Sequence, residues 1–549
     1  MKFWIVTLGF CALEIISLSA STPFADWTFA IDVPGTKSKV FLWIPPKCQH
    51  VRGLILGQQV ILENKVFEDP IIRQAATDEN LAIALICPGC LGYFDDKNQP
   101  APKLLQDILD ALAAESGYTE IAQAPLLTVG HSGNGIFAWR VAYWNPTRMI
   151  GVVGIHCMSS QPPPQYPKAT VNGVPILDIS GEYESWGNPD VPLDQHWRWL
   201  RGGLLEFRGQ SAHALMSELV DPGGCHFSFN EPLAHYVALF IRKAAEARLP
   251  ETAPNDPSQP VSLREINPES GWLTDLKLLT PSDHPPAPYT HYSGDLSLAF
   301  WHFDQEMAEA TESYRTEAKG KRDQRITFIQ DGKPLPAEWI ETLKFEPLED
   351  GLTVKVQAGF LSETPAGVAG AGKPLGHASA PIHFSLIGGW RGGGEQTGPD
   401  TFRLHPDHLG PTDNLMILAY QEGDRNYAWA EQPAQIKYPV KNTLGQPQKI
   451  TFPAIADQPA NTQKIPLTAT SDSGLPVEYY VERGPAVIDG SNLKILPLPP
   501  RAKYPVKVTV VAYQWGRTIA PLVQSAESVE QTFLLNASTN HPASSAKPN

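Results

Sequence analysis

The sequence predicts an α/β domain built on a doubly wound, mostly parallel sheet, followed by β-rich domains. Residues 25–250 alternate short buried apolar runs with helix-like apolar stripes, whereas later segments show short β-like runs separated by turn residues. Proline is also abundant, with 52 in 549 residues, which favours loops and turns over long coiled coils. At roughly 150 residues per domain, this length predicts three or four domains.

The composition is that of a globular protein with an acidic surface. Charged residues make up 18% and hydrophobic residues 42% of the chain, and the formal net charge is −15. The sequence contains no basic block that could follow a phosphate backbone. We therefore expect no nucleic-acid partner.

Residues 1–20 resemble a secretory signal peptide. Lys2 provides the positive start, residues 3–16 are mostly apolar, and residues 18–21 are small enough for cleavage. An uncleaved anchor is the alternative, although the apolar run is short for a membrane span. No later segment is long and apolar enough to cross a membrane. We expect a secreted or periplasmic protein without a membrane span.

Five cysteines follow the signal segment, and all precede residue 230. They are Cys48, Cys87, Cys90, Cys157 and Cys225. An oxidising compartment permits disulfides, but an odd number leaves one thiol over, and the pairing stays open. The single C-x-x-C motif at residues 87–90 has no second pair, so we interpret it as structural and expect no metal and no cofactor.

The elements of residues 25–250 follow from the periodicity of their apolar residues. Continuous apolar runs predict buried strands, and apolar positions three and four residues apart predict helices. The expected strands are residues 28–33, 39–44, 53–56, 81–86, 126–129, 150–155, 174–179 and 214–220. The expected helices are residues 67–78, 103–115, 133–143 and 233–248. This alternation predicts a parallel sheet with helices on both faces.

The rest of the chain divides into three parts. A linker at 250–260 leads to an accessory domain at 261–445, β-rich with one helix at 302–319. Residues 447–537 show strands at spacings near ten residues, which predicts an all-β sandwich. Residues 538–549 are expected to be a disordered tail. Since all candidate site residues precede Leu249, we expect residues 25–250 to fold and act alone.

The most informative stretch is Gly130-His131-Ser132-Gly133-Asn134-Gly135. A buried strand leads directly into it and a helix follows at once, as in a nucleophile elbow that raises the serine above the sheet edge. We therefore predict Ser132 as the nucleophile. Asn134 stands where the elbow pattern has glycine, so we expect looser packing there.

A serine hydroxyl needs a histidine to accept its proton, and His226 is the best candidate. It lies in a glycine-rich loop between the last expected strand and the last expected helix. The competing histidines occupy expected strand or helix positions: His156, His213, His196 and His235.

The third member of the triad is expected after the strand at residues 174–179. Glu184 lies three positions after Gly181 and is our candidate, with Glu182 and Asp190 as alternatives. Its role would be to fix the tautomer of His226 and stabilise the imidazolium. The oxyanion hole would use the backbone N–H groups of Gly133 and of Gln58, with Gln59 as the alternative.

On these motifs, residues 25–250 resemble the α/β-hydrolase superfamily, and within it secreted bacterial esterases of the dienelactone-hydrolase and feruloyl-esterase type. The likeness rests on Gly130–Gly133, the acid after Ile179 and residues 223–227. It implies ester hydrolysis through an acyl-enzyme and no metal. Residues 447–537 are similar to bacterial Ig-like domains, on residues 451–458, 473–477 and 484–487.

Trp186 and Trp197 lie between the expected acid and the last strand and are candidates for substrate binding, since aromatic rings stack on sugars or aromatic acyl groups. Packing of a small cap is the alternative. We expect a secreted serine esterase acting on polysaccharide-linked or other extracellular esters. The competing hypothesis is an extracellular binding or adhesion protein with an inactive hydrolase domain. The oligomeric state stays open.

Overall fold

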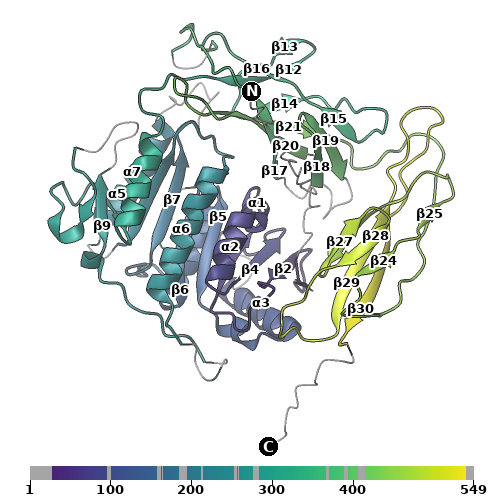
Figure 1. Cartoon of the computed structure of the whole chain (residues 1–549), viewed down its shortest axis with the longest axis horizontal. Helices are drawn as coiled ribbons and strands as arrows, with labels where there is room; N and C mark the ends of the chain where they lie inside the picture. The colour runs from purple at the N-terminus through teal and green to yellow at the C-terminus, as the bar shows by residue number, and fades with distance from the viewer. Residues whose placement is uncertain are drawn as a thin grey trace, which may run out of the picture.

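The computed structural model describes residues 27–538 with twelve short gaps. The gaps are residues 96–100, 158–161, 163–164, 185–194, 210, 212–213, 253–255, 257–258, 276–282, 367–369, 389–392 and 406–413. The expected signal peptide, and the expected tail from residue 539 on, therefore lie outside the described residues. The first domain is the α/β part of Figure 1, and β-rich parts follow it.

An eight-stranded sheet in the order β1-β2-β4-β3-β5-β6-β7-β8 forms the centre of the first domain. The strands are β1 (Phe29–Asp32), β2 (Lys39–Trp43), β3 (Gly53–Gln58), β4 (Leu81–Cys87), β5 (Leu126–His131), β6 (Met149–Ile155), β7 (Ile176–Gly181) and β8 (Met216–Asp221). β2 is antiparallel to both of its neighbours, and the strands from β4 to β8 run parallel. The sheet is therefore mixed, and the expected mostly parallel sheet is confirmed.

Helices cover both faces of the sheet because alternate strand residues point to opposite sides. In β4, Ala82 and Ala84 face the core under α3 (Ala101–Ser116) and α4 (Asn134–Trp144). Ile83 and Leu85 face the core under α1, α2 and α6. The bounds of these three helices are Glu63–Glu68, Pro70–Asp78 and Glu231–Arg248. α5 (Gln195–Gly209) precedes β8.

The prediction of a single helix at residues 67–78 is wrong about where the helix begins. The structure has two helices there, separated by Asp69, whose extended backbone ends α1 and whose carboxylate accepts from the amides of Ile71 and Ile72. Pro70 at the first position of α2 favours this arrangement, since its missing N–H needs no partner there.

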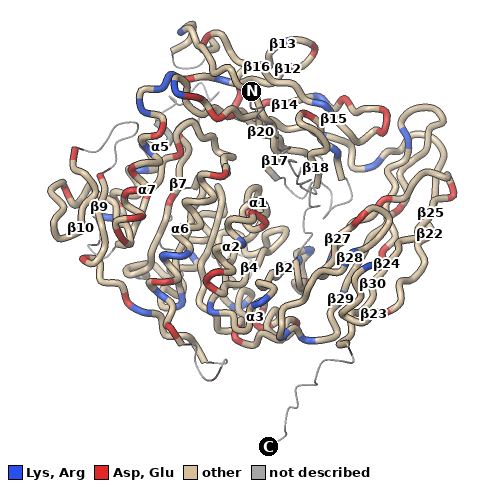
Figure 2. The backbone as a smooth tube through the Cα atoms, in the orientation of Figure 1, with Lys and Arg blue, Asp and Glu red and all other residues tan. Residues whose placement is uncertain are grey.

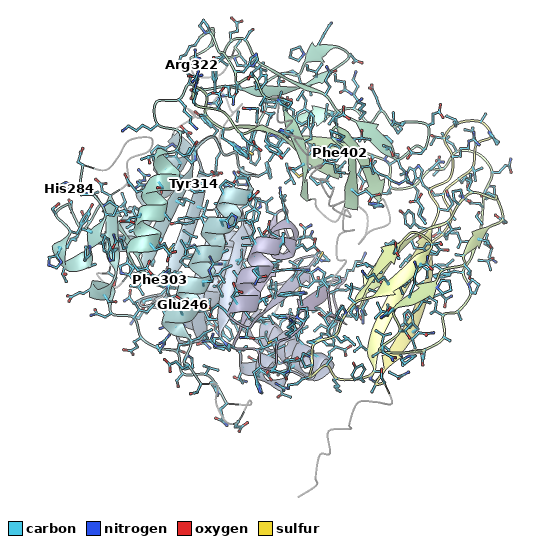
Figure 3. All side chains as sticks on the ribbon, in the orientation of Figure 1. Glu246, His284, Phe303, Tyr314, Arg322 and Phe402 are labelled. Carbon is cyan, nitrogen blue, oxygen red and sulfur yellow. The ribbon has the colours of Figure 1, made fainter. Side chains whose placement is uncertain are left out.

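The segment after the linker packs directly on the edge of the large sheet. It forms β9 (Trp272–Asp275), β10 (Ala287–Pro288), β11 (Ala299–His302) and α7 (Gln305–Thr316). The Ser217 hydroxyl of β8 donates to the carbonyl of Trp301 at 2.5 Å. The rings of Phe240 in α6 and Phe303, just before α7, lie 5.6 Å apart. Figure 3 labels Phe303 and Tyr314 toward opposite ends of α7. These contacts extend the core of the first domain beyond residue 250.

A chain that ends at Leu249 is therefore expected to melt roughly 10 °C or more below the full chain, or to aggregate. It would expose apolar side chains of α6 such as Phe240, each worth about 1.5–3 kcal/mol of burial. Differential scanning fluorimetry and gel filtration of both chains measure this. A truncated chain that stays monomeric with the melting temperature of the full chain would restore the independent domain expected from the sequence.

The accessory domain contains three further small sheets. Their orders are β13-β12-β16, β14-β21-β20-β17 and β15-β19-β18. The strand bounds are β12 (Ile326–Gln330), β13 (Lys333–Pro334), β14 (Glu341–Leu343), β15 (Thr353–Lys355), β16 (Ala358–Phe360), β17 (His383–Gly388), β18 (Gly393–Gly398), β19 (Thr401–His405), β20 (Asn414–Gln421) and β21 (Ala430–Lys437). All but the β14–β21 pair are antiparallel, so this domain is β-rich, as expected, and α7 is its helix.

In the C-terminal part, over the described residues 447–538, the regular elements are strands. The sheets are β22-β25, β23-β30-β29-β26 and β24-β28-β27. The strand bounds are β22 (Ile450–Thr451), β23 (Gln458–Pro459), β24 (Lys464–Pro466), β25 (Thr470–Ser471), β26 (Glu478–Arg483), β27 (Ala486–Asp489), β28 (Asn492–Ile495), β29 (Val506–Tyr513) and β30 (Val529–Asn536). The all-β architecture is as expected, while the likeness to Ig-like domains stays a prediction.

The C-terminal part returns to the first domain and contacts it through ion pairs. Arg501 pairs with Glu120 at 2.9 Å, and Arg483 pairs with Asp32 at 2.7 Å. In Figure 2, short Lys/Arg and Asp/Glu segments are scattered over the described backbone, and no long Lys/Arg stretch is drawn. Within the described ranges, none of the helices has the length and apolar character that a bilayer span requires.

Candidate active site

Ser132 lies in the tight turn between β5 and α4, with a left-handed backbone φ of 53°. This conformation is strained for a non-glycine residue and is retained where the surroundings fix it. The turn needs small neighbours: a Cβ on Gly130 would lie 2.1 Å from the carbonyl oxygen of Asn134, and one on Gly135 would lie 2.3 Å from Cys157 Sγ. The sequence therefore folds here into the geometry of a nucleophile elbow.

The structure brings Ser132, His226 and Glu184 together at the carboxyl ends of the parallel strands. His226, in the loop between β8 and α6, has its Nε2 2.9 Å from Ser132 Oγ. Its Nδ1 lies 3.2 Å from Glu184 Oε2, in the turn after β7. This relay of hydroxyl, imidazole and carboxylate has the distances that proton transfer from the serine requires.

Glu184 is fully buried, and three donors surround its carboxylate. Besides His226, the amide of Gly181 lies 2.7 Å and His156 Nδ1 lies 3.0 Å from Oε1. Burial alone would raise the pKa of Glu184, but the hydrogen bonds from His156 and His226 outweigh it and hold the pKa well below its usual range. The side chain is therefore an ionised acceptor for the far nitrogen of His226.

The two alternatives for the acid differ in what can be said of them. The carboxylate of Glu182 accepts from the amide of Gly223 at 2.9 Å and braces the β8 loop. Burial raises its pKa, partly offset by that amide and by Arg325. Its hydrogen bonds do not include His226. Asp190 lies outside the described residues.

Sequence reasoning missed the part that His156 takes in this site. His156 follows β6 directly and has its Nδ1 on Glu184 and its Nε2 2.9 Å from the carbonyl of Ser228. Its position at the end of a buried parallel strand was a usable signal, since such ends converge at one sheet edge. His235 is exposed on α6, and His213 lies outside the described residues, as does the side chain of His196.

The elbow offers one clear donor for an oxyanion. The amide of Gly133, at the start of α4, has no hydrogen-bond acceptor among the described residues. Of the residues after β3, the amide of Gln59 donates to Ile86, and those of Val60 and Ile61 donate to Glu63. The second donor therefore stays a prediction, with Gln58, the last residue of β3, as the candidate.

The packing at Asn134 is tight, so the expected looseness is wrong. Asn134 is 4% exposed, and its side-chain amide donates to the carbonyl of Gln58 at 2.5 Å and to Glu63 at 3.2 Å. The Glu63 carboxylate, whose pKa burial raises, also accepts from the amide of His131 at 3.0 Å. The side chain that replaces the usual glycine therefore ties the elbow to the loop after β3.

The accessory domain reaches the site through Trp339 and Glu431. The ring of Trp339 lies 5.2 Å from that of His226 and is 42% exposed. Glu431 accepts from the amide of Cys225 and from the hydroxyl of Ser228, both at 3.1 Å. Both contacts join residues that are more than a hundred positions apart, which no local sequence pattern indicates.

Of the two tryptophans expected to bind substrate, only Trp197 is among the described residues, and it is buried. Trp186 lies outside the described residues. Trp197 in α5 is 2% exposed, and the guanidinium of Arg201 lies 4.4 Å from its ring. Its contacts are therefore packing contacts, and the exposed aromatic side chains near the elbow are Trp339 and Tyr93, which would lie 3.5 Å from a Cβ on Gly133.

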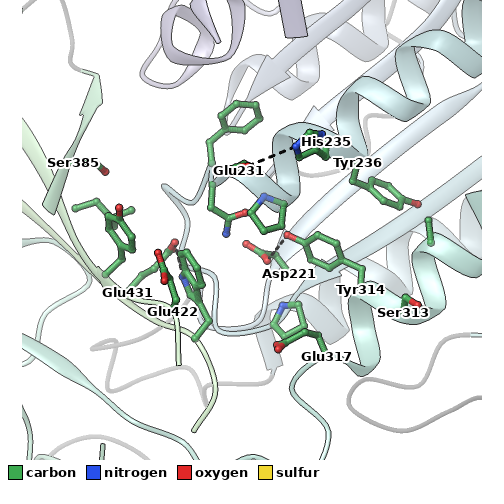
Figure 4. A pocket seen from close by; sticks show the side chains of 18 of the residues that line it. Asp221, Glu231, His235, Tyr236, Ser313, Tyr314, Glu317, Ser385, Glu422 and Glu431 are labelled. Atoms are coloured by element: carbon green, nitrogen blue, oxygen red, sulfur yellow. Dashed lines mark hydrogen bonds and ion pairs between the residues drawn. The ribbon is translucent and has the colours of Figure 1, made fainter. Parts of the chain in front are cut away.

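Two cavities lie near the triad. A cavity of about 190 Å³ is lined by the loop after β3, Tyr93 and Asn134. A larger one, of about 970 Å³, lies between α6, α7 and the accessory domain (Figure 4). Asp221 and Glu431 line the larger cavity and lie next to the loop that holds His226. The Tyr314 hydroxyl donates to Asp221 at 2.9 Å. Neither lining includes a triad residue.

The described part of the chain contains no disulfide and no group of three or more side chains arranged to hold a metal ion. Cys87 is the last residue of β4 and is buried, and Cys90 lies three positions after it.

Comparisons with known proteins found likeness only among solved structures. No family model matches the chain, and no curated protein matches its sequence. It is similar to an S-formylglutathione hydrolase from Agrobacterium tumefaciens, with 13% identity and a TM-score of 0.30 over 41% of this chain and 98% of that one. It is also similar to a dienelactone hydrolase from Anabaena variabilis, with 18% identity and a TM-score of 0.28 over 41% of this chain and 98% of that one. For the Bacillus cereus carboxylesterase the identity is 13% and the TM-score is 0.28, over 38% of this chain and 96% of that one.

Proposed function

We propose that the chain is a serine hydrolase that cleaves carboxylic esters through an acyl-enzyme. The observation that carries the proposal is the imidazole of His226, whose Nε2 lies 2.9 Å from Ser132 Oγ while its Nδ1 faces the buried Glu184. A serine in a strained turn, a base and an orienting acid form the arrangement that activates a hydroxyl for attack on an acyl carbon.

The reaction follows from these positions. His226 Nε2 accepts the proton of Ser132 Oγ as the oxygen attacks the ester carbonyl, and Glu184 stabilises the imidazolium that forms. The amide of Gly133 donates to the developing oxyanion. The imidazolium then protonates the leaving alcohol, which departs and leaves an acyl-serine. A water molecule, deprotonated by the same imidazole, attacks the acyl-serine and releases the acid.

The substrate belongs outside the cell under this proposal, on the evidence of the signal-like residues 1–20. Exposed aromatic rings on both sides of the triad, Tyr93 and Trp339, support an ester attached to a polymer such as a polysaccharide.

Labelling by a fluorophosphonate probe tests the proposal. The purified full-length chain is treated with the probe, digested and analysed by mass spectrometry. We expect one labelled peptide with the adduct on Ser132, and no adduct after heat denaturation. Absence of labelling in the folded protein would favour the extracellular binding protein with an inactive hydrolase domain.

A further inference from the structure

Two histidines share the carboxylate of Glu184. Oε2 faces Nδ1 of His226 at 3.2 Å, and Oε1 faces Nδ1 of His156 at 3.0 Å. The centroids of the two imidazole rings lie 6.1 Å apart. His156 has a left-handed backbone φ of 48°, and its side chain is fully buried. The fold thus retains a strained residue that does not touch Ser132.

The surroundings of His156 define its protonation. Both of its ring nitrogens face oxygen atoms that only accept hydrogen bonds, namely the ionised carboxylate of Glu184 and the carbonyl of Ser228. A neutral imidazole has one N–H and would leave its other nitrogen facing a lone pair inside the protein. Burial lowers the pKa of His156, but the hydrogen bond and charge of Glu184 and the Ser228 carbonyl outweigh it, and the pKa is raised.

We propose that His156 is a positioning residue that stays an imidazolium behind Glu184 and tunes the base His226 through the carboxylate that the two histidines share. This rests on the proposed esterase function. A full carboxylate charge would favour the protonated form of His226, which cannot accept the serine proton. The positive charge of His156, at the other oxygen of Glu184, offsets part of that carboxylate charge beside His226.

Other titratable groups also contribute to the charge around His156. His131, at the end of β5, is neutral because burial and the nearby His226 and His156 hold its pKa well below the usual value. Asp178 of β7 is protonated because burial and Glu218 hold its pKa well above the usual value. Burial, followed by the charge of Glu431, raises the pKa of Asp221 to about 7. His156 and Glu184 therefore form the ionised pair next to His226.

The test is the pH dependence of kcat/KM for p-nitrophenyl acetate in full-length His156→Asn. Asparagine keeps an N–H for Glu184 and removes the charge. The variant loses a positive charge about 6 Å from His226, and this loss favours the protonated form of His226. The acid limb, which is the rise of kcat/KM with pH on the acid side of the profile, is therefore expected to move up by roughly one to two pH units. A uniform loss of activity with the limb unmoved would overturn the proposal, since it would mean a merely structural role.

A control variant and an NMR measurement test the role of His156 independently of the proposed esterase function. His302 is also fully buried but neutral, with a pKa that burial lowers to about 3, so His302→Asn should lower the melting temperature without moving the limb. NMR of 15N-histidine protein reads His156 without any catalysis, assigned by its loss in His156→Asn or His156→Gln. An imidazolium signal at pH 7.5 is expected. A neutral signal would overturn the proposal even in an active esterase, and an inactive wild type with the imidazolium signal would overturn only the proposed function.

Discussion

Ser132→Ala is expected to lower the turnover of p-nitrophenyl acetate by at least about 10⁴-fold and to abolish fluorophosphonate labelling. The hydroxyl is the group that His226 Nε2 faces, and alanine offers no atom that can form the acyl intermediate. Serine and alanine both carry a Cβ, so the left-handed turn is equally strained in both variants. We therefore expect the same melting temperature, within about 2 °C, as the wild type.

A matched control for this variant is Ser180→Ala in β7. Ser180 is fully buried, and its hydroxyl has no hydrogen-bond partner within the part of the chain that the structure describes. Its removal should leave hydrolysis and labelling intact. If Ser132→Ala hydrolyses the ester at the wild-type rate, the nucleophile lies elsewhere and the triad geometry has no catalytic role.

Glu184→Gln is expected to lose about 10⁴-fold in turnover, whereas Glu182→Gln should remain close to the wild type. A glutamine amide donating to Nδ1 would hold His226 in the tautomer with its proton on Nε2, where it cannot accept from Ser132. Glutamine at 182 keeps an acceptor for the amide of Gly223. Initial rates of both variants under saturating ester measure the difference.

The same change should also lower the melting temperature. In Glu184→Gln, the buried imidazole of His156 loses its ionised partner, and breaking a buried pair from one side is destabilising. Equal stability of Glu184→Gln and the wild type would contradict the ionised pair. The reverse order of activities would instead move the orienting acid to Glu182.

The sequence predicted the triad residues Ser132, Glu184 and His226 because each is marked by a pattern of nearby residues. Ser132 is marked by a strand, a tight turn and a helix within about fifteen residues. Glu184 and His226 are marked by their positions just after predicted strands, and parallel strands bring such ends to one edge. The helix of the accessory domain was likewise visible from its apolar stripe and is observed as α7.

What the sequence left out depends on contacts between distant segments. Glu63, fully buried under the elbow, reads along the chain as an ordinary first-turn helix residue. Trp339 and Glu431 reach the His226 loop from a separate domain, and hydrophobic periodicity says which face of an element is apolar but not which segment covers it. The contacts of Phe240 and Ser217 with residues beyond 250 are of the same kind, so the boundary near residue 250 stays a prediction that the truncation tests.

The cover of the α6 face also sets an order of events during synthesis. Met307, Met416 and Leu418 belong to the same apolar cluster as Phe240 and Ala244, yet they leave the ribosome much later. At about 5–20 residues per second, α6 and the edge of β8 wait on the order of 10–30 s for this cover. During that interval the nascent chain is expected to present the apolar face of α6 to the solvent, and to be most prone to aggregation then.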